Sequence, residues 1–465
     1  MASNLLRKKS IERLVGETEM DGHRLRRTLT SMDLVAIGIG CIIGVGIFVL
    51  PGVEAATAAG PGIILSFAIA AVACACNALC YAELAAMIPV SGSAYTYGYA
   101  TLGEFFAWVI GWDLILQYMG GAVMVATGWS AYFVNLARTI GIRMPQALIA
   151  SPWDKEPGLF NVPASVIVLV ITGLLIIGIK ESARVNLAIV IVKIGVILLF
   201  IGAAAGHLDP TKWRPFMPFG FQGVLKASAV VFLAYLGFDA VSTASEEARR
   251  PQRDIPIGII GSLGVATILY IAVSAIMTGV VPYYELGVAD PVAKVVNTLQ
   301  IPWASAIISV GALAGMTTVL LVLVLSGPRI LLSMSRDQLL PPALSRIHVK
   351  YRTPYVATLL TGGVVAAAAG LMPLNVSAEL TSMGALFAFI FVAVSVIVLR
   401  HLQPDINRPF RVPLSPLIPG FGALICLFLV FSLSRITHLR FLIWLAAGII
   451  VYFLYGFRKS SQAAG

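Results

Sequence analysis

Charge is the property that this sequence has least of. Only 12% of its 465 residues are Asp, Glu, Lys or Arg, whereas 58% are hydrophobic. A soluble globular protein has roughly twice that share of charged residues, so the composition predicts a polytopic, all-α membrane protein. Cysteine and histidine are also scarce, at five each, and the cysteines all fall within apolar stretches. We therefore expect neither a disulfide framework nor a metal site.

The sequence also lacks the patterns that carry enzyme chemistry. It contains no nucleophile elbow and no phosphate-binding loop. The glycines Gly38, Gly40 and Gly44 do not match a dinucleotide fingerprint, because their spacing differs and no β-strand can precede them. We expect a protein that is not an enzyme, that needs no cofactor and that binds no nucleic acid.

The hydrophobic runs predict twelve membrane-spanning helices. They are residues 33–59, 61–88, 102–138, 160–179, 186–206, 223–246, 255–281, 302–335, 354–371, 376–400, 416–434 and 440–457. An even number places both termini on one side of the membrane. If that side is the cytoplasm, 21 Lys and Arg lie inside and nine outside. The positive-inside rule then predicts cytoplasmic termini and a multi-pass protein of the cell (inner) membrane.

The first predicted span is interrupted by glycine. Four glycines lie between Gly38 and Gly46, yet the flanking residues are apolar enough for a bilayer. Each glycine costs a helix about 1 kcal/mol relative to alanine, so the span is expected to break midway. Broken membrane helices often bind small charged solutes with their freed backbone groups. The alternative is that Gly-x-x-x-Gly only allows two helices to pack closely.

A second interruption is predicted in the sixth span, where Gly237 adjoins the intramembrane carboxylate Asp239. Paired breaks at corresponding positions of two halves indicate an inverted-repeat transporter, with the substrate held where the broken helices meet. The expected organisation is a cytoplasmic segment at 1–32, a first repeat at 33–206, a second repeat at 207–401, and two further helices with a short cytoplasmic tail at 402–465.

Three ionisable residues inside predicted spans are candidates for proton coupling: Lys193, Asp239 and Asp113. A charge at such depth is costly and is a functional hypothesis by default, and a buried lysine can exchange its proton near physiological pH. For Lys193 a fixed salt bridge or snorkelling is the alternative, and Asp239 could simply cap a half-helix. Glu83, at the end of the second span, is expected to be structural.

Several motifs together resemble the amino acid–polyamine–organocation superfamily. They are Gly38-x-Gly40-x-x-x-Gly44-x-Gly46-Ile47-Phe48, Tyr81-Ala82-Glu83-Leu84-Ala85, Gly237-Phe238-Asp239 with Glu246-Glu247, and Pro328-Arg329 with Ser335-Arg336-Asp337. The last two are similar to its cationic amino acid transporter branch, in its bacterial type. The resemblance implies a leucine-transporter-type fold of five plus five inverted helices, with helices 1 and 6 broken and two helices added.

The resemblance also implies which residues hold an amino acid. The substrate carboxylate would meet the backbone amides of Gly44, Val45 and Gly46, and its ammonium group would meet backbone carbonyls. These carbonyls belong to Ile42, Leu233, Ala234 and Leu236, and the remaining candidates for substrate binding are Phe238, Gln117 and Leu323. Lys193 matches a lysine of helix 5 that stands where sodium-coupled relatives place their ion, which implies coupling to protons.

Two positions depart from the family pattern. Val45 stands where bacterial relatives often have a small hydroxyl residue, and Gln117 stands where they often have a glutamate. A Lys–Glu pair is therefore not available to Lys193, which would change charge against the first helix break or against Asp113. The bulky, apolar Leu323 near the substrate side chain favours small neutral amino acids over arginine or lysine.

The sequence thus predicts secondary-active, proton-coupled symport of small neutral L-amino acids by alternating access. A carrier or exchanger of cationic amino acids or polyamines is the alternative within the same class. An amino acid sensor that does not transport is the alternative from another class. The expected partners are the amino acid and the lipid bilayer, and the sequence does not identify any small membrane-protein partner.

Overall fold

A computed structural model describes residues 7–9, 29–88, 93–139, 141–154, 156–177, 183–243, 248–351 and 353–459. Within these ranges all regular elements are helices, joined by loops and turns, and one isolated β-bridge links Leu29 and Ala248. Most of the predicted N-terminal segment lies outside the described residues, and so do Glu246 and Glu247 of the third motif.

Seven helices of the described ranges are long and apolar enough to cross a membrane. They are α6 (Ile63–Met87), α8 (Glu104–Thr139), α10 (Ala183–Ala205), α13 (Pro251–Val280), α15 (Pro302–Arg336), α17 (Leu374–Leu402) and α19 (Arg435–Val451). The last continues into the π-helix Tyr452–Gly456. Their exposed residues are largely apolar, as at Leu198, Ile268 and Leu442, which suits contact with lipid.

The other predicted spans coincide with shorter apolar helices. These are α3 (Ser31–Ile42), α9 (Val162–Ile177), α11 (Gly220–Val231), α16 (Tyr355–Leu371) and α18 (Leu417–Ser432). A helix of 17 residues is about 25 Å long, which is less than the roughly 30 Å of a hydrocarbon core. Two of the five, α3 and α11, are short because a break in the helix follows each of them, after which a further short helix begins.

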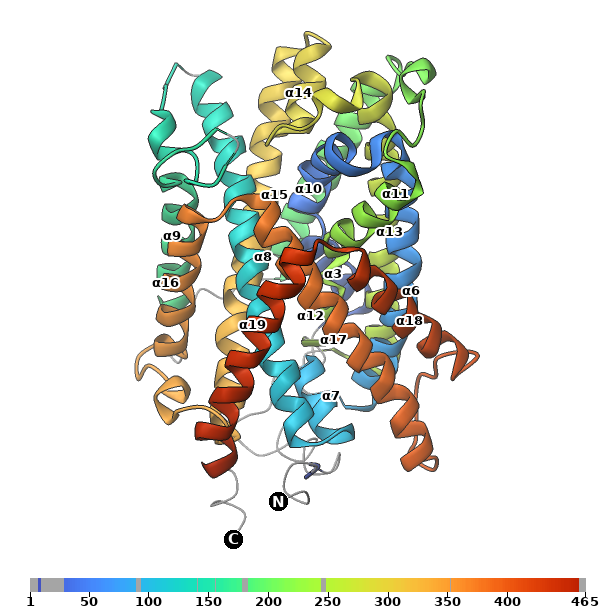
Figure 1. Ribbon diagram of the computed structural model, residues 1–465, viewed down its shortest axis with the longest axis vertical. Coiled ribbons are helices and arrows are strands. Elements are labelled where there is room, and N and C mark those ends of the chain that lie inside the picture. The colour runs from blue at the N-terminus through green and yellow to red at the C-terminus, as the bar shows by residue number, and fades with distance from the viewer. Residues whose placement is uncertain are drawn as a thin grey trace.

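Two short helices connect the long ones at opposite ends of the molecule, α7 (Ser93–Thr101) and α14 (Pro291–Thr298) (Figure 1). Further turns of helix are Ala55–Ala59, Gly60–Gly62, Gln146–Leu148, Pro210–Trp213, Tyr283–Glu285 and Pro342–Ser345, and four more belong to the site described below. The long helix α8 packs against α15 and α17, while α13 packs against α3 and α6. The site described below is enclosed by these two groups of helices.

Glu83, near the end of α6, is a structural anchor, as the sequence predicts. Its carboxylate is 1% exposed, and it accepts hydrogen bonds from Arg400 Nε at 3.0 Å and from the Val412 backbone amide at 2.6 Å. A buried carboxylate is stable only when it is paired in this way. These hydrogen bonds connect the end of α6 with the end of α17 and with the loop that follows α17. They lie at the same end of the molecule as α7 (Figure 1).

Candidate functional site

The first predicted span is interrupted at Ile43 and Gly44. The helix α3 ends at Ile42, Ile43 is extended, and the chain resumes at α4 (Val45–Phe48) and α5 (Leu50–Glu54). Glycine is required here by close approach, because a Cβ on Gly44 would lie 2.9 Å from Val319 Cγ2. The first amides of the resumed helix have no partner within it, so this break presents hydrogen-bond donors.

The second interruption lies directly opposite the first. A 3₁₀ turn over Phe232–Tyr235 follows α11, and the helix resumes as α12 (Phe238–Thr243) after Gly237, whose φ is +120°. A Cβ on Gly237 would lie 2.7 Å from Cys41 Cβ. The two breaks are therefore in contact, which a side chain at this glycine would prevent.

Tyr270 of α13 joins the two breaks, and the sequence analysis did not identify it. Its hydroxyl lies 2.8 Å from the carbonyl oxygen of Ile42 and 2.6 Å from that of Ala234. Both carbonyls were predicted to meet a substrate ammonium group, and a carbonyl oxygen with two lone pairs can accept a second donor. The sequence offers only a general indication of this role, because a buried tyrosine usually finds a hydrogen-bond partner.

One cavity with an empty volume of about 600 Å³ lies between the breaks and the helices α8, α15 and α17. Its lining includes nine of the ten predicted substrate-binding residues, namely Ile42, Gly44, Val45, Gly46, Gln117, Leu233, Ala234, Leu236 and Leu323. Phe238 does not line it. That side chain is fully buried and packs against the rings of Tyr81 and Phe389, with centroid distances of 5.7 and 5.3 Å.

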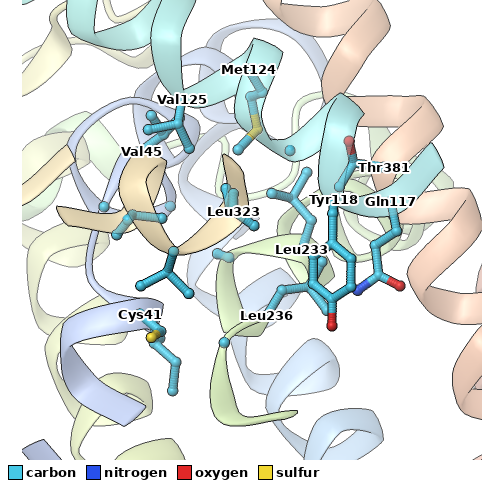
Figure 2. A pocket seen from close by; sticks show the side chains of 18 of the residues that line it. Cys41, Val45, Gln117, Tyr118, Met124, Val125, Leu233, Leu236, Leu323 and Thr381 are labelled. Carbon is cyan, nitrogen blue, oxygen red and sulfur yellow. The ribbon is translucent and has the colours of Figure 1, made fainter. Parts of the chain in front are cut away.

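The cavity has an apolar side and a polar side. Figure 2 shows Val45 and Val125 on one side of Leu323, and Gln117, Tyr118 and Thr381 on the other. Further lining residues that the sequence analysis missed are Cys41, Gly121, Met124, Val319, Val322 and Ser326. The arrangement suits a solute with an aliphatic part and several polar groups.

The side chain of Val45 is accommodated by a glycine of α8. A Cβ on Gly128 would lie 2.8 Å from Val45 Cγ2, so the branched residue occupies space that only glycine leaves open. Val45 is 1% exposed, and its backbone amide opens the resumed helix. Having Val45 here instead of a small hydroxyl residue therefore changes the packing against α8. The backbone amides of the break can still donate hydrogen bonds to a solute.

Gln117 brings an unsatisfied polar atom to the cavity. Its side chain is 2% exposed, and its Oε1 has no hydrogen-bond partner within the described part of the chain. A buried acceptor without a donor is costly. A hydroxyl or ammonium group of a bound solute would satisfy it, so this atom favours a ligand with a hydrogen-bond donor on the polar side.

Lys193 of α10 lies beside the first break rather than in the cavity lining. It is fully buried, and its Nζ donates to the carbonyl of Gly40 at 2.7 Å. Gly40 is in the last turn of α3, where the helix dipole favours a positive charge. The aliphatic part of the Lys193 side chain packs against Gly315 of α15, where an added Cβ would lie 3.3 Å from Lys193 Cε.

The two acidic candidates differ in their surroundings. Asp239 lines the cavity, and its carboxylate accepts hydrogen bonds from Tyr118 Oη at 3.1 Å and from the Gly237 amide at 3.0 Å. The contact with the Gly237 amide lies at the start of the resumed helix, which agrees with the simpler role of a helix cap. Asp113 is fully buried outside the lining, and neither of its oxygens has a hydrogen-bond partner among the described residues.

Comparison with known proteins gives a family match over nearly the whole chain. A family model described as amino acid permease matches residues 29–455. A branched-chain amino acid permease, BcaP, of Bacillus subtilis is 51% identical over 465 residues, covering 99% of each chain. A methylthioribose transporter of the same organism is 49% identical over 459 residues, again covering 99% of each. The vacuolar cationic amino acid transporter 2 of Arabidopsis thaliana is 40% identical over 86% of this chain and 64% of its own.

Proposed function

We propose that this chain, which belongs to the amino acid permease family, carries neutral aliphatic amino acids across a membrane by secondary-active transport. The predicted resemblance to the amino acid–polyamine–organocation superfamily is confirmed, and the protein is a multi-pass membrane transporter rather than an enzyme. We place it in the cell membrane with both termini in the cytoplasm, as the distribution of Lys and Arg predicts.

The single observation that carries the proposal is the cavity between the two helix breaks. Backbone amides of Val45 and Gly46 open one half-helix there and suit a carboxylate. Carbonyls of Ile42 and Ala234, which both lie within reach of the Tyr270 hydroxyl, belong to the two breaks and suit an ammonium group. A free amino acid presents both charges on one carbon atom, so the two breaks together match its backbone.

The proposed fold has twelve membrane-spanning helices in two inverted repeats of five, followed by two more. The seven long and five shorter apolar helices support this count, and the two breaks occur where the first helix of each repeat is expected. Alternating access would move α3, α6, α11 and α13 relative to α8, α10, α15 and α17. The described packing of α13 against α3 and α6, and of α8 against α15 and α17, agrees with such a division.

The proposed substrates are small neutral L-amino acids, extended to those with branched side chains. The apolar side of the cavity is built by Val45, Val125 and Leu323, and no acidic side chain stands among these three. These three residues suit an aliphatic side chain, and Asp239, which also lines the cavity, already accepts hydrogen bonds from Tyr118 and from the Gly237 amide. The similarity to a branched-chain permease supports the extension to leucine, isoleucine and valine.

The proton is the proposed coupling ion, and no other cofactor is needed. Lys193 bonds to Gly40 in the half-helix that leads into the first break, so its charge state can influence the backbone that receives the substrate. Asp113, buried without a hydrogen-bond partner among the described residues, is a second group that protonation would stabilise. Asp239 is the third candidate, through its contact with Tyr118.

A second candidate substrate is a neutral thio-sugar of the methylthioribose type. The observation that favours it is the polar side of the cavity, where Gln117 Oε1 has no hydrogen-bond partner among the described residues and where Thr381 brings a hydroxyl group (Figure 2). A ribose ring carries several hydroxyls, and a methylthio group suits the apolar side. The similarity to a methylthioribose transporter agrees with this possibility.

Uptake into proteoliposomes separates these functions. The proposal predicts that labelled leucine enters and that valine, isoleucine and alanine compete, while arginine, putrescine and methylthioribose compete weakly. If arginine competed more strongly than valine, isoleucine and alanine, the inference that the apolar side of the cavity selects aliphatic side chains would be refuted. Stronger competition by methylthioribose would establish the second candidate, and tight binding without uptake would indicate a sensor.

A further inference from the structure

A second hollow lies where α16 ends and α17 and α19 begin. It has an empty volume of about 1000 Å³ and is lined by Trp153, Leu371, Met372, Pro373, Asn375, Val376, Leu380 and Arg440. We call it the rim groove. In Figure 1 the turn between α16 and α17 and the start of α19 lie well below α14 at the top of the molecule. The helices α16, α17 and α19 are apolar enough to suit membrane spans, and the groove lies near their ends.

The rim groove combines an apolar wall with a concentrated positive charge. Six of its eight lining residues are apolar, and the other two are Asn375 and Arg440. Arg440 forms no ion pair within the described part of the chain. The helix α17 begins at Leu374, inside this lining. The amide of Val376 in its first turn already donates to the side chain of Asn375 at 3.0 Å, so Arg440 is the group of this lining that can attract an anion.

This combination selects the chemistry of an occupant. A small soluble anion would satisfy Arg440 but would leave the apolar wall exposed. A neutral lipid would cover the wall but would leave the guanidinium without a counter-charge. An anionic amphiphile does both, and beside the ends of apolar helices the abundant molecules of that class are anionic phospholipids. Trp153 is 78% exposed at the groove, and exposed tryptophan is typical of the boundary between lipid and water.

We propose that the rim groove binds one anionic phospholipid. Its phosphate lies against the Arg440 guanidinium, close to the start of α17. One acyl chain follows Leu371, Met372 and Leu380 towards the membrane interior. The groove and the central cavity lie on two sides of one helix, because Leu380 lines the groove and its neighbour Thr381 lines the cavity.

Native mass spectrometry of the purified full-length protein tests the proposal. The protein is titrated with phosphatidylglycerol and, separately, with phosphatidylcholine of the same acyl chains. We expect one phosphatidylglycerol to bind at least tenfold more tightly, since a hydrogen bond to a charged group is worth about a factor of ten or more. Equal binding of the two lipids would overturn the proposal.

Variants assign the binding to this groove. Arg440→Gln should abolish the preference for phosphatidylglycerol, while Arg435→Gln should keep it, because Arg435 is exposed on the same helix but does not line the groove. Equal loss in both variants would mean general attraction by surface charge and would refute the site. If Arg440→Gln does not fold, Leu380→Trp, which fills the groove, should reduce binding of the lipid by a similar factor. Unchanged binding in Leu380→Trp would contradict the proposal.

Discussion

Adding one methyl group to the cavity should change which amino acids the protein carries. A Cβ on Gly121 would lie 3.4 and 3.5 Å from the two Cδ atoms of Leu323, and 3.5 Å from Thr381 Cγ2. These are ordinary van der Waals distances, so Gly121→Ala should fold without displacing its neighbours. The new methyl group would take the space of one substrate carbon. A misfit of one carbon in an apolar pocket costs about 1–3 kcal/mol, or about 10- to 200-fold in kcat/KM.

The assay compares uptake of leucine and alanine by proteoliposomes that contain wild type or Gly121→Ala. We expect kcat/KM for leucine to fall at least tenfold, while the value for alanine changes little, because its side chain does not reach the added methyl group. Gly264→Ala is the matched control, since a Cβ there meets no atom within 4 Å. An equal loss for both amino acids, or no loss for leucine, would refute the assignment of this side of the cavity.

Three further predictions concern single side chains. Lys193→Ala should still bind substrate but lose accumulation driven by a pH gradient, and full accumulation would refute its role. Tyr270→Phe removes the hydroxyl between the carbonyls of Ile42 and Ala234 and should lower transport about tenfold, measured as initial uptake rate. Burial raises the pKa of Asp290, before α14, from 3.8 to about 6. The folded state therefore binds this proton more tightly, so stability falls as pH rises from about 4 to 6. Asp290→Asn should remove that fall, which thermal unfolding at several pH values would reveal.

The two helix breaks could be predicted from the sequence because their cause is local. Glycines concentrate at Gly44 and Gly46 in an otherwise apolar span, and Gly237 adjoins a carboxylate in another. The structure shows why glycine is needed: a Cβ on Gly46 would lie 2.7 Å from the Cβ of Ala234 in the opposite break. The family resemblance then added the residues of α8 and α15 that line the cavity, Gln117 and Leu323.

Contacts between distant spans could not be predicted in the same way. Tyr270 has apolar neighbours in sequence, and its role depends on two carbonyls that lie 36 and 228 residues away. Phe238 follows the second break directly, yet the turn at Gly237 directs its ring towards Tyr81 and Phe389. In both cases the direction of a side chain is set by packing between helices, which the spacing of residues along one helix does not reveal.

Accumulation of a neutral amino acid under a proton gradient tests the central claim most directly. Proteoliposomes that contain the protein are loaded at pH 8, diluted into labelled leucine at pH 6, and compared with liposomes held at one pH. We predict accumulation above the external concentration with the gradient, equilibration without it, and collapse of the accumulation when a protonophore is added. Leucine uptake that is the same with and without the gradient would contradict proton coupling, and no uptake of any neutral amino acid would contradict the proposed function.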